Sequence, residues 1–247
     1  MPTLRIIGPG RAGLSLAGAL EGTSFEVVEL LGRNDSVAAA ADGVDLVVIA
    51  TPDAVIESTS AAIQPTDTTV VAHMSGAWGT RLLGTHRLRA AIHPLVALPD
   101  PSTGSERLRA GAWFAVAGHE IVSRIVSEIH GHPFEVSDEH RALYHASAVI
   151  ASNHLVALLG QAERVSADAG VPFEAILALV RGTVANVGVL GPSSALTGPA
   201  ARGDEATIAR HISALPADER DIYQAMAGEA RRLAGRDSPP ANAEDRS

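Results

Sequence analysis

The chain has 247 residues, of which 46% are hydrophobic, and it carries a formal net charge of −9. This composition is typical of a globular protein with one large or two modest domains, and its acidity argues against a nucleic-acid partner, because such binding needs basic surface. All 19 basic residues are arginines and there is no cysteine. Disulfides, thiolate nucleophiles, cysteine-ligated zinc, Schiff-base chemistry and a lysine general acid are therefore excluded.

Membrane insertion and export are not indicated by the sequence. The longest uninterrupted apolar runs, such as 146–150, are far shorter than a membrane span. No signal-type segment precedes the first expected strand. We therefore expect a cytoplasmic protein that contacts no membrane.

The N-terminal stretch predicts a dinucleotide-binding turn. An apolar strand over 3–7 is followed by a helix over 14–20, and between them lie the glycines of a G-x-G-x-x-G motif. In such a motif the first glycine permits the tight turn, the second lets the backbone approach a pyrophosphate, and the third packs the helix on the strand. The alternative is a structural glycine-rich turn. The candidate cofactor-binding residues are Gly8, Pro9, Gly10, Arg11, Ala12 and Gly13.

Strand and helix patterns then alternate as far as residue 137, which indicates βαβ units and a mostly parallel sheet. Strands are expected over 25–31, 45–51, 69–73, 90–93, 111–117 and 133–136, with helices over 37–41, 54–63 and 119–130. The fold class is therefore α/β, with a Rossmann nucleotide-binding domain over 1–137. From residue 138 only helical patterns follow, over 139–169, 173–190, 205–215 and 217–234. This predicts an all-helical domain over 138–236, and the polar residues 237–247 predict a disordered tail.

The end of the second strand indicates which dinucleotide is bound. An acidic residue there accepts the ribose 2′-hydroxyl of NAD, whereas an arginine favours the 2′-phosphate of NADP. Arg33 holds this position, and Asn34 and Ser36 can donate further hydrogen bonds to a phosphate. Glu29 is a rival reader, and Arg33 has the alternative of a solvated loop charge. We expect NADP(H) rather than NAD(H).

Further polar residues follow the neighbouring strands, whose carboxyl ends form the ligand edge of an open parallel sheet. Thr51 and Pro52 end one strand, Ser75 and Gly76 follow His73 at the end of the next, and His93 ends another. Thr51, Pro52, Ser75 and Gly76 are candidates for cofactor contacts, Ser75 also for substrate contacts, and the two strand-end histidines for function or structure.

The helical region adds a second polar set. His145 and Ser152 are seven residues apart and so share a helix face, with Asn153 beside it. Polar residues on an otherwise Ala/Val/Leu-rich helix indicate a polar cleft or a partner.

Further along the chain, a Gly- and Pro-rich loop over 191–204 follows a helix that bears Asn186. The loop contains Thr197, Arg202 and Asp204, which suit an anionic-substrate clamp. The alternative is a connector in which Asp204 caps the next helix.

With these residues in view, the chain resembles the Rossmann-like proteins that carry a DUF2520 helical domain. The resemblance rests on motifs in the family's order: Ser75-Gly76-Ala77, Ile92-His93-Pro94-Leu95, Tyr144-His145-Ala146, Ser152-Asn153, and Ala195-Leu196-Thr197-Gly198-Pro199 with Arg202-Gly203-Asp204. It implies kinship with the 6-phosphogluconate dehydrogenase and ketopantoate reductase superfamily, in which some members are thought to reduce ketopantoate in pantothenate synthesis.

The chain departs from that superfamily at the catalytic position, where the relatives use a lysine with an asparagine one helical turn on. Here the helix offers His145 and Asn153. If the chain is such a reductase, His145 is the first choice for the general acid and His93 the second, since histidine titrates near neutral pH. Asn153 and Asn186 would orient the carbonyl, and Arg202 would bind the substrate carboxylate.

The resulting expectation is an NADP(H)-dependent oxidoreductase that reduces a small anionic 2-oxo acid, with ketopantoate the leading candidate and substrate bound between the sheet edge and the helical domain. Alternatives are another superfamily reaction, on an imine, a pyrroline-carboxylate or a prephenate-type substrate, and a non-catalytic NADP-binding regulatory protein. Because the helix over 139–169 is rich in apolar surface and small residues, we also expect a homodimer through the helical domain.

Overall fold

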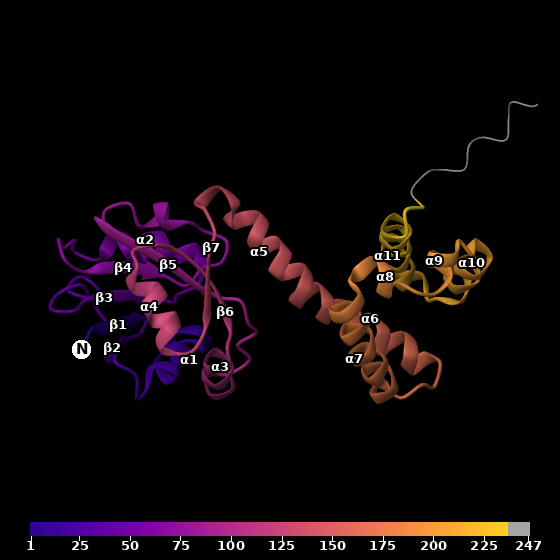
Figure 1. Cartoon of the computed structure of the whole chain (residues 1–247), viewed down its shortest axis with the longest axis horizontal. Helices are drawn as coiled ribbons and strands as arrows, with labels where there is room; N and C mark the ends of the chain where they lie inside the picture. Colours follow the sequence, from indigo (N-terminus) through magenta and orange to yellow (C-terminus); the bar gives the residue numbers. More distant parts are fainter. Residues whose placement is uncertain (237–247) are drawn as a thin grey trace, which may run out of the picture. The chain divides into compact units, whose positions relative to one another are not determined.

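The computed structural model describes residues 1–236, and the chain divides into two compact units between His154 and Leu155 (Figure 1). The expected disordered tail over 237–247 lies outside the described residues.

The first unit is built on one seven-stranded sheet. Its strands are β1 (Thr3–Ile7), β2 (Glu26–Leu31), β3 (Leu46–Ile49), β4 (Val70–His73), β5 (Leu88–Pro94), β6 (Trp113–Gly118) and β7 (His132–Glu135), in the order β2-β1-β3-β4-β5-β6-β7. Only β5 and β6 pair antiparallel, and all other neighbours are parallel. This confirms the expected α/β class with a mostly parallel sheet.

Helices cover both faces of this sheet, as the continuous apolar strands require. They are α1 (Arg11–Leu20), α2 (Ile56–Ala62), α3 (Pro101–Arg109) and α4 (Ile121–Glu128). One core contains Leu16, Leu108 and Ile125, and the other contains Val47 and Ile56. The expected helix over 37–41 is a run of turns instead, and α3 was not predicted.

Strand order creates a crevice at the edge of the sheet. From β1 the chain moves to β2 on one side and then returns to β3 on the other. The connections after β1 and β3 therefore diverge at their carboxyl ends, which is the switch point where ligands bind in open α/β sheets.

The helical run expected over 139–169 is present as α5 (Arg141–Val149), a π-helical turn (Ile150–His154) and α6 (Leu155–Asp168). Although the sequence places the domain boundary near 137, the first compact unit extends to His154. The reason is that α5 packs on the sheet, with Arg141 fully buried and the Tyr144 ring edge-on to Phe134 at 5.7 Å.

The second unit is all-helical, as predicted. After α6 it contains α7 (Phe173–Leu190), α8 (Pro192–Ala195), α9 (Pro199–Arg202), α10 (Glu205–Ala214) and α11 (Arg220–Leu233). Its buried apolar cluster is small and consists of Ala200, Ile208 and Ala227. The guanidinium of Arg164 on α6 donates to both carboxylate oxygens of Glu219, at 2.5 and 3.1 Å, just before α11.

Two long helical stretches of the chain are apolar. Asp138–Asp168 and Phe173–Leu190 are long and apolar enough to cross a membrane by length and composition alone, and neither apolar segment is buried within the structure. The sequence analysis found no such stretch because it searched for uninterrupted apolar runs. In these helices isolated polar residues interrupt the runs, but the mean hydropathy stays high.

Candidate functional site

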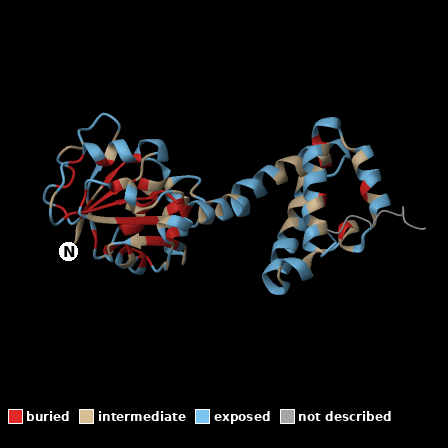
Figure 2. Cartoon of the chain, turned by 90° about the horizontal axis from the view of Figure 1, so that it is seen from above, coloured by how far each residue is buried: buried red, intermediate tan, exposed pale blue. Residues whose placement is uncertain are grey.

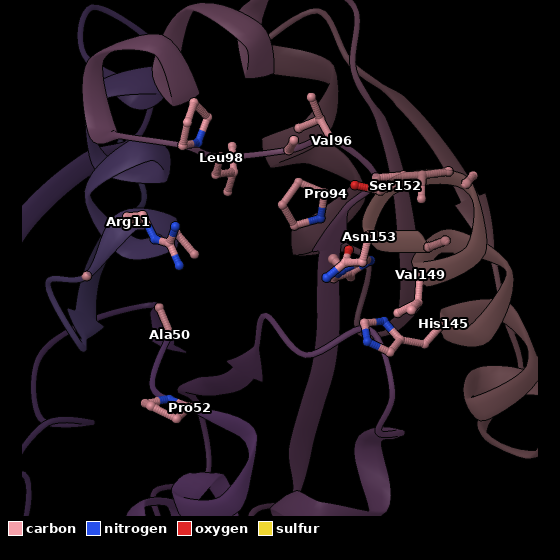
Figure 3. A pocket seen from close by; sticks show the side chains of 18 of the residues that line it. Arg11, Ala50, Pro52, Pro94, Val96, Leu98, His145, Val149, Ser152 and Asn153 are labelled. Carbon is pink, nitrogen blue, oxygen red and sulfur yellow. The ribbon is translucent and has the colours of Figure 1, made fainter. Parts of the chain in front are cut away.

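A pocket of about 930 Å³ lies at the switch point of the sheet, within the first unit (Figure 3). One wall carries Arg11, Ala50 and Pro52, and the opposite wall carries His145 and Asn153. Residues 93–99, at the end of β5 and directly after it, line the pocket between the two walls. Of the residues predicted to be functional, the structure gathers Gly10, Arg11, Ala12, Thr51, Pro52, His93, His145 and Asn153 around this one space.

The three glycines of the turn differ in their surroundings: two are packed against the backbone and one faces open space. Gly8 has a φ of +98°, and a Cβ there would lie 2.9 Å from the carbonyl carbon of Ala50. A Cβ on Gly13 would overlap the carbonyl oxygen of Gly8, whereas one on Gly10 would meet nothing within 4 Å. Gly8 and Gly13 are thus required by the fold, while Gly10 leaves the backbone open to a ligand.

Two other features of this wall suit a dinucleotide. Gly10 is the N-cap residue of α1 and has no side chain to cap the helix, so the first N–H groups of the helix remain available to an anion such as a pyrophosphate. The hydroxyl of Thr51 is buried and has no hydrogen-bond partner among residues 1–236. A buried polar atom normally has a partner, so this one suits a polar group of a bound ligand.

The loop after β2 carries the residues that the sequence predicts to contact the adenosine ribose. Arg33, Asn34 and Ser36 are exposed there, and the Gly32 N–H donates to Asp35 at 2.7 Å. Glu29, the rival reader, accepts a hydrogen bond from Arg5 on β1 at 2.9 Å. The two side chains form a surface ion pair in which Glu29 is half-exposed.

The turn after β4 uses its polar residues internally. The Ser75 N–H donates to Nδ1 of the buried His73, so Nε2 of His73 carries the proton and donates to the Gly79 carbonyl at 3.1 Å. Burial lowers the pKa of His73. The Ser75 hydroxyl donates to Asp53 at 2.8 Å and accepts from the Ala77 N–H. Ser75 does not line the pocket, and the structure gives its hydroxyl a part in shaping the turn.

Two histidine rings converge beside Gly76. A Cβ at position 76 would lie 2.6 Å from Nδ1 of His145 and 2.7 Å from Nε2 of His93, so glycine is required by both rings. The rings meet edge-on, with centroids 5.8 Å apart. Nδ1 of His93 is 2.7 Å from the Tyr144 hydroxyl, whereas Nδ1 of His145 is buried without a partner among the described residues.

Burial and positive neighbours hold His93 neutral. Desolvation, followed by the charges of His145, Arg141 and His73, lowers the pKa of His93 to about 4. At pH 7 the ring therefore carries one proton, on either Nδ1 or Nε2.

The sequence interpretation missed Arg141 and assigned no role to Tyr144. Arg141 is four residues before His145 and three before Tyr144, so helix geometry places all three on adjoining faces of α5. That spacing was the available signal, but an arginine at a helix start is usually a surface charge, and its complete burial depends on the sheet beneath it.

The remaining predicted residues belong to the second unit. Asn186 is exposed on α7, Thr197 is exposed before α9, and Arg202 is exposed at its end. Asp204 accepts from the Thr207 N–H at 3.1 Å and the Thr207 hydroxyl at 2.7 Å, so it caps α10. These bonds hold the pKa of Asp204 below its usual range. The capping alternative offered by the sequence is thus present.

Comparison with known proteins identifies a domain and a fold. Residues 115–230 match the family model DUF2520, a domain of unknown function. No curated protein matches the sequence.

Among the solved structures that resemble the chain, three do so over 94% of its length and 98% of theirs. They are a proposed NADP oxidoreductase of Bacteroides fragilis (18% identity, TM-score 0.76), the protein TM1727 of Thermotoga maritima (23%, 0.72) and the 1-pyrroline-5-carboxylate reductase of Streptococcus pyogenes (15%, 0.63). At these identities the likeness shows a common fold.

Proposed function

The chain is a Rossmann-like protein with a DUF2520 domain, and from this premise we propose that it is an NADP(H)-dependent oxidoreductase that reduces a small 2-oxo acid. Ketopantoate is the first substrate to test. The observation that carries the proposal is the pocket in which an open glycine turn faces two histidines and an asparagine. A site with both a cofactor wall and a proton-donating wall suits hydride transfer better than cofactor storage.

The proposed cofactor wall consists of the glycine turn, the end of β3 and the loop after β2. The N–H groups at the start of α1 would hold the pyrophosphate, and Arg33 with Asn34 would hold the 2′-phosphate. The orphan hydroxyl of Thr51 would bond a polar group of the cofactor. When bound, NADPH supplies the hydride, and the protein supplies placement and a proton.

On the substrate side, we propose that the pair His93 and His145 provides the proton and that Asn153 orients the carbonyl. Asn186 and Arg202 belong to the second unit, and the roles expected of them towards the carbonyl and the carboxylate stay predictions. An Arg202→Ala variant is expected to raise KM for a 2-oxo acid about tenfold or more, which is the effect of losing a charge-assisted pair. An unchanged KM would remove Arg202 from the site.

The decisive experiment follows NADPH oxidation with a panel of 2-oxo acids, including ketopantoate, and a panel of cyclic imines, including 1-pyrroline-5-carboxylate. Oxidation of NADPH by a 2-oxo acid, at least tenfold more efficient than by any imine, is the expected result. A preference for an imine would assign imine reduction instead, the reaction class named for the Streptococcus pyogenes relative. Tight NADPH binding without turnover of either panel would favour a regulatory protein.

A second proposal concerns the uncovered helix α7. Half-buried residues, Phe173, Ile176, Leu177 and Val180, occupy one face, and the opposite face is exposed and small or apolar: Ala175, Ala178, Leu179, Gly182, Ala185 and Val189. A Cβ on Gly182 would meet nothing within 4 Å. Small residues let two helices approach closely, so we propose that a second copy of this chain covers this face and forms a homodimer.

Charge favours the same occupant. The two charged residues of α7 are Glu174 and Arg181. Both lie beside the small and apolar face rather than on it, so a second copy that covers this face buries no charge of α7. A dimeric mass in solution without detergent is expected for a cytoplasmic protein of this kind. A monomeric mass would overturn the proposal. A protein that stays in solution only with detergent or vesicles would also overturn it and would indicate that a membrane covers this face.

A further inference from the structure

A buried arginine without a hydrogen-bond partner among the described residues lies close enough to His93 and Tyr144 for its charge to act on both. Arg141 is 0% exposed, and none of its three guanidinium nitrogens has a hydrogen-bond partner within residues 1–236. The carboxylate three residues earlier, Asp138, accepts instead from the N–H groups of Thr80 and Arg81, at 3.1 and 3.3 Å. Asp138 therefore acts on the guanidinium through its charge, without a direct hydrogen bond. A buried charge is costly unless it is paired, so a guanidinium without a hydrogen-bonded anion needs another explanation.

Such a charge is useful where negative charge develops only during a reaction. The charge of Arg141 acts on three rings around it: Tyr144, His93 and His73. His73 uses both ring nitrogens in its own turn. Tyr144 and His93 remain, and they are joined by the 2.7 Å contact between the phenol oxygen and Nδ1.

The two ends of this Tyr–His pair face different spaces. His93 lines the main pocket, where its Nε2 lies beside Gly76 and Nδ1 of His145. Tyr144 lines a separate pocket of about 500 Å³ with Ser137 and His140, and does not line the main one. A proton that passes through the pair would thus move from the second pocket to the first.

We propose that Tyr144 and His93 form a proton relay into the main pocket and that Arg141 is the positioning residue that stabilises negative charge on Tyr144. The proposal rests on the reductase function proposed above and deepens it by naming the proton path. It reverses the sequence-based preference for His145 as the acid, and His145 becomes a neighbour that helps to hold the substrate oxygen.

The step balances as follows. As the carbonyl carbon gains a hydride with its electron pair, the C=O π pair moves to oxygen, which takes the proton from Nε2 of His93. Nδ1 of His93 takes the phenolic proton of Tyr144, so the imidazole stays neutral with its proton moved across the ring. The O–H bonding pair remains on Tyr144 as a phenolate beside Arg141. A solvent proton that is delivered through water in the second pocket restores the phenol, and His93 returns to its Nε2–H tautomer by proton exchange with water in the main pocket after the product leaves.

The protonation states suit this sequence. His93 is neutral at pH 7, because burial and the charges of His145, Arg141 and His73 lower its pKa to about 4. Burial raises the pKa of Tyr144 to about 12, and the charge of Arg141 acts in the opposite direction. Tyr144 is therefore a protonated donor, and Arg141 reduces the cost of its transient ionisation.

The first test needs no substrate. In ¹⁵N spectra of the histidine rings at pH 7, His93 is expected as the neutral Nε2–H tautomer in the wild type and as mixed tautomers in Tyr144→Phe. The Nδ1–H tautomer of His93 in the wild type would overturn the relay. This result stands whether or not any panel substrate is reduced, so failure of the relay and failure of the proposed function are distinguishable.

The second test uses the 2-oxo acid that is reduced best. Tyr144→Phe is expected to lower kcat about 100-fold and to leave KM and NADPH affinity within about twofold. The chain contains a matched control, because its other tyrosine, Tyr223, makes the same contact with Nδ1 of His211 at 2.6 Å in the second unit. Tyr223→Phe is expected to keep full kcat, and an undiminished kcat in Tyr144→Phe would overturn the proposal.

Arg141→Met separates positioning from structure. Replacing an unpaired buried charge with an apolar side chain of similar length is expected to keep or raise the thermal stability, while kcat falls at least tenfold and its pH profile shifts. Arg141→Lys, which retains the charge, is expected to recover part of kcat. A variant Arg141→Met that unfolds, or one that is stable with full kcat, would assign Arg141 no part in the relay.

Discussion

The two units of the chain bury their apolar residues to very different extents (Figure 2). In the first unit, strands such as β3 are buried along their whole length, between two apolar cores. In the second, α7 has 18 residues and none is buried. Both units follow their sequence patterns equally well, so the difference lies in what covers the elements.

An apolar sequence pattern predicts which element forms, but it does not always predict what covers the apolar face of that element. In a βαβ unit the covering helix comes from the same stretch of chain, so the pattern that forms the element also completes its packing. In a pair of long helices the second apolar face needs a partner that the local pattern does not specify. The first unit is thus complete by itself, whereas we propose that the second is completed by another copy.

The largest expected effect is on the complete core. Phe114 on β6 is 0% exposed, and Phe114→Ala is expected to lower the free energy of unfolding by about 4 kcal/mol, because it removes buried surface and leaves a cavity. Denaturant unfolding at several protein concentrations measures it. A cost below about 1 kcal/mol would show that the first unit is less tightly packed than its burial indicates.

The glycine turn gives the next effect, with a matched pair of variants. Gly13→Ala places a methyl group on the Gly8 carbonyl oxygen, so we expect a loss of about 3 kcal/mol in stability. Gly10→Ala meets open space, so its stability should stay within about 0.5 kcal/mol while NADPH affinity falls at least tenfold. Equal stability losses in the two variants would contradict the division between packing and ligand space.

A substitution on the exposed face of α7 should weaken dimerisation rather than folding. Leu179 is 67% exposed on α7, and Leu179→Glu is expected to weaken dimerisation about 100-fold, or about 3 kcal/mol, because it buries a charge in the proposed interface. Analytical ultracentrifugation across a dilution series measures this. Ile222→Glu on α11, at a residue 46% exposed, is the control and should remain dimeric. Unaltered association in Leu179→Glu would leave α7 without the proposed partner.

Much of the fold could be predicted because its determinants are local. Continuous Val/Ile runs, glycine stops and helical spacing indicated the seven strands and the long helices. The exceptions are instructive: α3 is a polar helix without a strong apolar stripe, although Asp100 and Pro101 were a readable start, since Asp100 caps the helix through the Thr103 N–H. At 37–41 an alanine-rich run forms only turns, because helix propensity alone does not stabilise five residues.

The candidate site could be predicted only where topology decides it. Parallel strand ends meet at one edge, so Thr51, Pro52 and His93 fall around one pocket. Which polar groups are already engaged depends on distant residues, as with the Ser75 hydroxyl, whose acceptor Asp53 lies 22 positions away. The burial of Arg141 has the same origin, since it follows from how α5 seats on the sheet. Local patterns contain neither fact.

The next, smaller effect is the loss of stability of the first unit at acid pH, which His93 causes and which the second unit does not share. The folded-state pKa of His93 is about 4, below its unfolded value of about 6.5, so the unfolded chain binds the proton first as the pH falls. The contribution of His93 is therefore complete above about pH 6.5 and is lost between there and about pH 4. We expect about 2 kcal/mol from it, less than the full shift implies because the ring is partly exposed.

Denaturant unfolding from pH 7 to pH 4 checks this, with His93→Gln as the variant that lacks the group. The unfolding of the first unit should lose part of its pH dependence in His93→Gln. The unfolding of the second unit should be the same in both proteins. If the pH dependence is unchanged in His93→Gln, the ring is not held neutral by its surroundings.

The smallest expected effect concerns the exposed edge of the cofactor wall. Arg33 is exposed after β2, so Arg33→Asp should leave unfolding unchanged, whereas NADPH binding should weaken about tenfold, or about 1.4 kcal/mol, through loss of the proposed phosphate contact. NADH affinity should hold or improve, because a carboxylate can accept the ribose hydroxyl. Titration of both cofactors measures the ratio, with Arg81→Asp, another exposed arginine of the first unit, as the control. If the wild type prefers NADH, or if the ratio is unchanged in Arg33→Asp, then a different part of the first unit selects the cofactor, and Glu29 is the next residue to test.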